Sequence, residues 1–115
     1  MKTRLLLFAA AALLGTGAAT AKPRTARCDI ATEEGPYRGP CLFAAERGGS
    51  FSLTPAGRRR FMGDVTLISV TLVGGGEAEV SGLTTGGINS RWGQARRSPR
   101  DRACWVGQDF TICVY

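Results

Sequence analysis

The sequence predicts a mainly β domain, either a small antiparallel β-sandwich or a partly open barrel, stabilised by disulfides and preceded by an irregular N-terminal arm. Three observations lead to this prediction. From residue 41 onward, short runs of alternating apolar and polar residues are separated by glycine turns. Residues 22–115 have no apolar pattern at the 3.6-residue spacing that a long helix requires. The four cysteines are Cys28, Cys41, Cys104 and Cys113, and an even number of cysteines in a small exported domain is typical of a disulfide framework.

Residues 1–21 have the pattern of a cleavable export signal. Lys2 and Arg4 precede an apolar run over residues 5–14, and Ala19-Thr20-Ala21 forms an A-x-A cleavage site. The apolar run is about ten residues long, whereas a membrane-spanning helix needs about 20. We therefore expect cleavage after Ala21, a periplasmic or extracellular mature protein, and no transmembrane anchor once the signal has been removed.

The mature chain divides at residue 40. Residues 22–40 contain Pro23, Pro36 and Pro40 without sustained periodicity, which predicts an irregular arm tied down through Cys28. Residues 41–115 form the predicted antiparallel β domain.

Residues 41–46 and 50–54 make the first predicted hairpin, with its turn around Gly48-Gly49. Pairing about that turn sets Ala44 opposite Leu53 and places Leu42 and Phe51 on the same face. The serines and the threonine of residues 50–54 then point the other way, as expected for a half-buried pair of strands.

The second hairpin joins residues 65–73 to residues 77–83 through the three glycines 74–76. This register pairs Leu72 with Ala78 and Val70 with Val80 on one face. Thr71 then lies opposite Glu79, and Val73 opposite Glu77, on the other face. A slip of one residue would mix the apolar and polar sets, so the register is well specified.

The third hairpin joins residues 103–106 to residues 110–115. A turn centred on Gln108-Asp109 sets Cys104 opposite Cys113 as a non-hydrogen-bonded pair, with Cα atoms about 4.5 Å apart, which a disulfide accepts. Gln-Asp is not a favoured two-residue turn, so we expect a bulged variant. Trp105, Phe110, Ile112 and Val114 would share the opposite face. Among the three connectivities of four cysteines, this register favours Cys104–Cys113 and hence Cys28–Cys41.

Several catalytic chemistries lack their residues. The chain has no histidine to serve as the base of a nucleophilic triad, and bonded cysteines supply no thiolate. The cysteine spacing contains no C-x-x-C, and the aspartates lack the spacing of a calcium loop, so we expect no metal and no cofactor. Glu77 and Glu79 would lie about 7 Å apart on one strand, which overlaps glycosidase geometry, but solvated surface positions explain them better. We therefore expect a protein that is not an enzyme, with a carboxylate-based hydrolase as the third alternative.

An arginine-rich segment is the candidate binding site. Its residues are Arg91, Trp92, Arg96, Arg97, Arg100 and Arg102. Guanidinium groups grip phosphate or carboxylate in forked geometry, and an indole stacks on bases or sugar rings. The expected partners are an anionic envelope component, such as lipopolysaccharide, phospholipid or acidic glycan, extracellular nucleic acid, or a protein. The alternative is a solvated connection with Trp92 buried in the core.

The charge of the chain bears on the same question. The formal net charge is +6, and it falls to +4 once Lys2 and Arg4 leave with the signal. A basic chain is compatible with an anionic partner. A genome with G/C-rich codons, which favours Ala, Gly and Arg together, explains the composition equally well.

Two resemblances accompany these observations. Landmarks such as Gly39-Pro40-Cys41, Gly48-Gly49-Ser50-Phe51, Gly87-Ile88-Asn89-Ser90-Arg91-Trp92-Gly93 and Ala103-Cys104-Trp105 resemble an uncharacterised family of small exported proteins of Gram-negative bacteria. That resemblance covers most of residues 28–115 and implies neither an activity nor site residues.

Ser81-Gly82, followed by Trp92 and a late cysteine, is similar to the periplasmic inhibitors of C-type lysozyme, and this similarity implies a small β-barrel. The chain departs from those inhibitors in its basic charge and in lacking a tyrosine after Ser-Gly. The expected function is thus binding or an envelope-structural role, with an enzyme inhibitor of the lysozyme type as the alternative.

Overall fold

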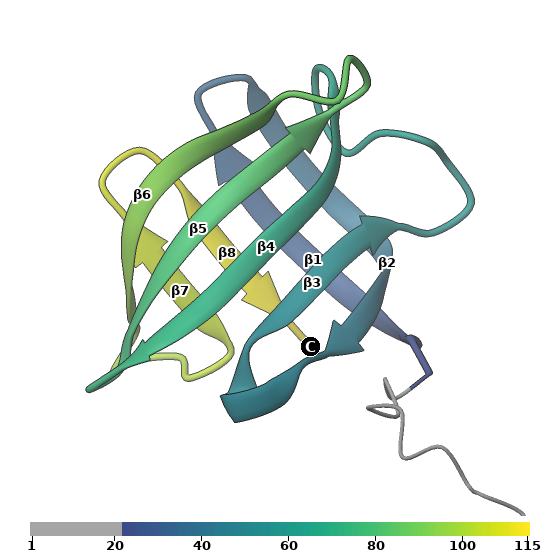
Figure 1. Ribbon diagram of the computed structural model, residues 1–115. Helices are drawn as coiled ribbons and strands as arrows, with labels where there is room; N and C mark the ends of the chain where they lie inside the picture. The colour runs from purple at the N-terminus through teal and green to yellow at the C-terminus, as the bar shows by residue number, and fades with distance from the viewer. Residues whose placement is uncertain (1–21) are drawn as a thin grey trace, which may run out of the picture.

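The computed structural model describes residues 22–115, which form a closed antiparallel β-barrel (Figure 1). Each strand pairs with the next along the chain, and the last strand pairs with the first. The predicted mainly β class is confirmed, and the sheet closes into a barrel through the pairing of β8 with β1. The strands are β1 (Arg24–Thr32), β2 (Gly35–Ala45), β3 (Phe51–Pro55), β4 (Val65–Gly74), β5 (Glu77–Thr84), β6 (Asn89–Arg97), β7 (Cys104–Gly107) and β8 (Thr111–Val114), with a short 3₁₀ turn, η1 (Arg47–Gly49), between β2 and β3.

The prediction of an irregular arm over residues 22–40 was wrong, because β1 and most of β2 lie there and pair along their length. The prolines suggested the arm, but their positions in β2 remove no hydrogen bond to β1. Ala56 N–H donates to the carbonyl of Pro40, so the backbone groups of Pro40 face away from β1. Pro36 lies four residues earlier and faces the same way, since the direction alternates along a strand.

The predicted register of the first hairpin was wrong by one residue. Phe43, and not Ala44, lies opposite Leu53. The η1 turn places Glu46 opposite Ser50, with Glu46 N–H donating to the Ser50 carbonyl at 2.7 Å. Phe51 and Leu53 point inward as expected, but they meet Cys41 and Phe43 instead of Leu42 and Ala44.

The other two hairpins follow the predicted registers. In β4–β5, Val70 pairs with Val80 and Leu72 with Ala78. A bulge after Leu72 makes Gly74, and not Val73, the partner of Glu77.

In β7–β8, Cys104 lies opposite Cys113, and the Cα atoms of the two cysteines are 4.0 Å apart. The turn closes with Gly107 N–H donating to the Phe110 carbonyl at 2.8 Å, and the strands keep one register without the expected bulge.

Both predicted disulfides are present, and no cysteine of residues 22–115 is free. Cys28–Cys41 joins β1 to β2 and is fully buried inside the barrel. Cys104–Cys113 joins β7 to β8 and lies on the outer side of the wall, opposite Trp105 and Ile112. Two disulfides indicate an oxidising compartment outside the cytoplasm.

The core fills the barrel lumen with branched aliphatic side chains from most strands. Ile30 of β1 pairs with Ile112 of β8, so the core runs across the seam where the barrel closes. The largest fully buried side chains are Ile30, Leu53, Ile68, Ile112, Val70 and Val80.

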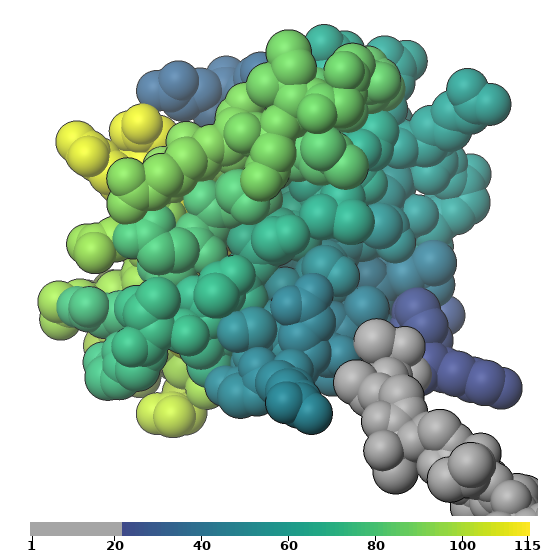
Figure 2. Space-filling model, in the orientation of Figure 1, coloured from purple at the N-terminus to yellow at the C-terminus, as the bar shows by residue number. Residues whose placement is uncertain are grey.

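Two stretches of the wall have no neighbouring strand at one end of the barrel. β3 pairs with β4 only from residue 51 to residue 53, and the β3–β4 loop fills the space beyond by burying Phe61 and Met62. That loop projects from the barrel in Figures 1 and 2. β7 pairs with β6 only through Ala95, Arg96 and Arg97. The β7–β8 hairpin is shorter than β1 and β6 beside it (Figure 1, yellow), which leaves the second opening.

Candidate functional site

The structure divides the predicted arginine-rich site among three places. The indole of Trp92 is partly buried and packs against the core. It lies over Gly82, where an added Cβ would come within 2.7 Å of the ring, and its centroid is 5.6 Å from that of Phe110. The alternative of a tryptophan buried in the core holds only in part, because the indole packs against the core but keeps some exposed surface.

Two of the arginines are neutralised by carboxylates on the outer face of β5 and β6. Arg91 donates two hydrogen bonds to Glu79, both at 3.0 Å, and Arg96 donates one to Glu77 at 2.9 Å. These pairs also assign Glu77 and Glu79 to solvated surface pairing, as their positions beside the turn suggested. They stabilise little, because exposed ion pairs typically contribute less than about 1 kcal/mol.

The remaining three arginines gather at the β6–β7 connection, at the end of the barrel opposite the two incomplete stretches of wall. Arg97 lies over the ring of Trp105 at 5.2 Å and donates through Nε to the Arg102 carbonyl at 2.8 Å. Among residues 22–115, Arg97, Arg100 and Arg102 form no ion pair. We call these three residues the arginine end.

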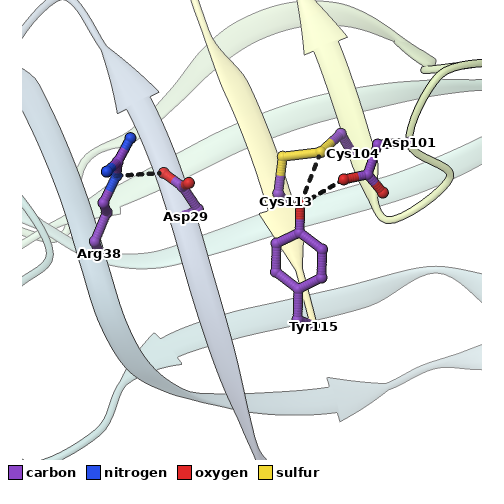
Figure 3. Close-up of polar contacts among 6 residues, drawn as sticks. All are labelled: Asp29, Arg38, Asp101, Cys104, Cys113 and Tyr115. Atoms are coloured by element: carbon purple, nitrogen blue, oxygen red, sulfur yellow. Dashed lines mark hydrogen bonds and ion pairs between the residues drawn. A yellow bond between two sulfur atoms is a disulfide. The ribbon is translucent and has the colours of Figure 1, made fainter.

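Asp101, which lies between Arg100 and Arg102 in the sequence, is directed toward Tyr115 (Figure 3). Asp101 accepts the hydroxyl of Tyr115 at 2.5 Å and the backbone N–H of Ala103 at 3.0 Å. The hydrogen bond from Tyr115, followed by that from Ala103, lowers the pKa of Asp101. The same bond to Asp101 is the main reason that the pKa of Tyr115 is raised. The Tyr115 hydroxyl lies 3.7 Å from Cys104 Sγ and so covers the outer disulfide.

Sequence reasoning missed a partly apolar concavity, which we call the slot. It has a volume of about 270 Å³ and opens beside the first part of β6, which has no pairing with β7. Trp92, Phe110, Gly82 and Val65 provide apolar surface, and the polar residues come from the β1–β2 turn, the start of β6 and the β7–β8 turn. The lining residues are Thr32, Glu33, Glu34, Val65, Gly82, Thr84, Ser90, Arg91, Trp92, Asp109 and Phe110.

A β-bulge shapes the slot. Val80 pairs with Gly93 and Ser81 with Arg91, so Trp92 is the extra residue. Bulges re-aim side chains, and this one turns the indole across Gly82. Gly93 has a φ of 113°, which favours glycine at the bulge.

The slot is acidic although the chain is basic. Glu33, Glu34 and Asp109 line it and form no ion pair within the described part of the chain, while the one lining arginine, Arg91, is held by Glu79. Glu33 and Glu34 are neighbours in the sequence, but no signal placed Asp109 beside them, because the β1–β2 and β7–β8 turns meet only when the barrel closes.

A second basic group lies on the β3–β4 loop. Arg58, Arg59 and Arg60 surround a shallow hollow with Thr85. Arg60 pairs weakly with Asp64 at 3.8 Å, and Arg58 lies 5.6 Å from the centre of the Tyr37 ring.

Residues 22–115 contain no cluster of three or more His, Cys, Asp or Glu side chains with metal-binding geometry. The same residues include no helix long and apolar enough to span a membrane. The predicted export signal lies outside the described residues. Comparison of the chain with protein-family models, curated proteins and solved structures finds no match.

Proposed function

We propose that this chain is an exported, non-enzymatic binding protein that recognises a protein partner at the slot. The observation that carries the proposal is that three carboxylates without an ion-pair partner among residues 22–115, those of Glu33, Glu34 and Asp109, line one pocket with an apolar floor. Concave, largely apolar sites with a few convergent polar groups are the usual places for recognition. The export signal pattern of residues 1–21, together with the disulfides, supports a periplasmic or extracellular location.

The partner chemistry that fits the slot is a cationic protein surface. Opposite charge across an interface raises the association rate and disfavours partners of the same sign. Inhibition of a cationic, lysozyme-type enzyme is the specific form of this function that we propose. The motif behind that resemblance lies at the slot, since Gly82 is directly beneath Trp92. The chain's net basic charge is less of an obstacle because the local charge of the slot is negative.

A lysozyme inhibition assay tests this function with charge-matched variants. Glu33→Gln combined with Asp109→Asn removes two slot carboxylates, and we expect inhibition to weaken at least about tenfold, equivalent to about 1.4 kcal/mol. Glu46→Gln combined with Glu77→Gln removes the same charge at the opposite end of the barrel and serves as the control. Equal inhibition by both double variants, or no inhibition by the unmodified protein, would reject this function.

The arginine end supports a second candidate function, the binding of anionic envelope components. Arg97, Arg100 and Arg102 lie within one short connection, and the nearby Asp101 is held by Tyr115 and Ala103. Guanidinium groups without carboxylate partners are available to phosphate and carboxylate ligands.

Retention on heparin and on vesicles containing anionic phospholipid tests this second function. Arg100→Gln combined with Arg102→Gln should elute at lower salt than the unmodified protein. Arg58→Gln combined with Arg59→Gln is the matched control, because it removes two arginines from the other end. If the control loses as much retention as the test variant, binding reflects net charge alone and the arginine end is not a site.

A further inference from the structure

The part of β6 that borders the slot is an open sheet edge. Residues 89–94 of β6 pair with β5 on one side, but β7 begins its pairing only at Ala95. Among the described residues no strand occupies the other side. Asn89, Ser90, Arg91 and Gln94 are exposed. Natural proteins usually block such edges, because unpaired N–H and C=O groups recruit another strand.

The backbone direction along this edge follows from one hydrogen bond. Thr84 N–H donates to the Ile88 carbonyl at 2.9 Å, so the backbone groups of Ile88 face β5. Because the direction alternates along an antiparallel strand, Ser90 also faces β5, and Asn89 and Arg91 face the open side. These two residues each present one N–H and one C=O group to an incoming strand.

The barrel blocks its comparable edge on β2. Residues 35–40 have no β3 partner, since β3 pairs only with residues 41–45. There the residues whose backbone faces away from β1 are Pro36, Arg38 and Pro40, and the two prolines offer an incoming strand no N–H donor, so only Arg38 keeps one. The β6 edge carries no proline. The two edges thus differ in their capacity to accept a strand.

The chemistry beside the β6 edge selects the incoming strand. The slot lies directly against the edge, with Ser90, Arg91 and Trp92 shared between them. A side chain that reached into the slot from a paired strand would meet Trp92 and Phe110 with its stem and the carboxylates of Glu33, Glu34 and Asp109 with its head. A lysine or arginine side chain has an apolar stem and a cationic head and suits both.

We propose that the open edge of β6 binds an extended protein segment as an additional antiparallel or parallel strand, with a basic side chain of that segment seated in the slot. This is recognition by strand addition, in which main-chain hydrogen bonds provide affinity and a pocket for alternate side chains provides specificity. The inference rests on the proposed function and states how the partner is held.

A phage-displayed library of linear 12-residue peptides, panned on the oxidised mature protein, tests the inference. We expect selected peptides to alternate in polarity and to share one lysine or arginine. Each synthetic peptide is then measured by calorimetry against the unmodified protein, Asn89→Pro and Asn89→Ala. Proline removes the outward N–H of Asn89, and we expect binding at least about tenfold weaker, whereas alanine retains that N–H and should stay within about twofold.

Two further measurements keep the test independent of how well Asn89→Pro folds. Bound peptide should slow hydrogen exchange at the amides of Asn89 and Arg91. Methylation of the peptide's own backbone nitrogens at alternate residues should abolish binding in one phase of the alternation and spare it in the other.

The inference is overturned if panning yields no binder, if methylation in either phase has the same effect, or if the edge amides stay unprotected in the complex. It is also overturned if those amides become protected by raising the protein concentration alone, because a second copy then occupies the edge. A protein partner that is lost with Glu33→Gln plus Asp109→Asn but retained by Asn89→Pro would leave the proposed function standing and reject strand addition.

Discussion

Replacing Gly82 by alanine tests how the floor of the slot is built. An added Cβ would lie 2.7 Å from Cζ2 and 2.8 Å from Nε1 of Trp92, closer than real Cβ contacts. Phe110 packs against the indole with ring centroids 5.6 Å apart, so the indole would be displaced toward the open slot. Phe110 is itself seated over Gly107, where a Cβ would fall within 2.3 Å of its ring.

The expected cost of this substitution combines two terms. Overpacking of a well-packed site typically destabilises by about 1–3 kcal/mol. Alanine in place of glycine within a strand returns about 0.5–1 kcal/mol of conformational entropy. We expect the free energy of unfolding to fall by about 1–2 kcal/mol. For a domain of this size, that corresponds to a drop in melting temperature of roughly 5–15 °C.

Thermal unfolding and tryptophan fluorescence measure both consequences. The emission of Trp92 should shift toward the red as the indole is displaced into solvent, while Trp105 remains buried. Gly86→Ala is the control, because its nearest neighbour would be Thr84 Oγ1 at 4.0 Å, and it should leave stability within about 0.5 kcal/mol of the unmodified protein. A Gly82→Ala protein as stable as this control, with unchanged emission, would refute the packing argument.

Three more predictions concern stability. Cys28→Ala combined with Cys41→Ala should lower the free energy of unfolding, measured in urea, by about 3 kcal/mol from loop entropy, with a further loss from the cavity that is left. Cys104→Ala combined with Cys113→Ala should lower it by less, because that loop is shorter and its site is less buried. The reverse order would contradict this prediction. Ser50→Ala should cost about 1–2 kcal/mol, because the buried hydroxyl accepts Leu72 N–H at 2.9 Å, whereas Ser52→Ala should be nearly neutral by the same urea measurement. The hydrogen bond between Asp101 and Tyr115 should persist at neutral pH. It should weaken in acid as pH falls through the lowered pKa of Asp101, and in alkali as pH rises through the raised pKa of Tyr115. NMR titration of the Tyr115 ring should show a lower pKa of Tyr115 in Asp101→Asn, and an unchanged value would reject the bond.

The strand registers that could be predicted from the sequence were those specified by local patterns. Val70 and Leu72 find Val80 and Ala78 because only one register separates apolar from polar faces. The position of Cys104 opposite Cys113 likewise follows from a short turn. At Gly48-Gly49 the turn type was not evident from the residues, and a 3₁₀ turn moved the register by one.

The remainder depended on information that a sequence does not carry locally. Pro36 and Pro40 indicated an irregular arm, because nothing in the residues says which side of a strand a missing N–H will face. The arginine-rich segment looked continuous, yet strand alternation and the bulge at Trp92 sent its members to different surfaces. The slot carboxylates Glu33 and Asp109 are far apart in sequence and meet only through the pairing of β1 with β8.

The placement of the two sulfur bridges has a consequence for the order of assembly. Each bridge links the two strands of one hairpin, β1–β2 or β7–β8, and within residues 22–115 the barrel is closed by the pairing of β1 with β8. Oxidation within a hairpin closes a small ring and needs no contact with the rest of the chain. Bringing the ends together is the most non-local event and is intrinsically slow. Both disulfides can thus form in two independent local steps, and the barrel then closes by pairing two hairpins that are already cross-linked.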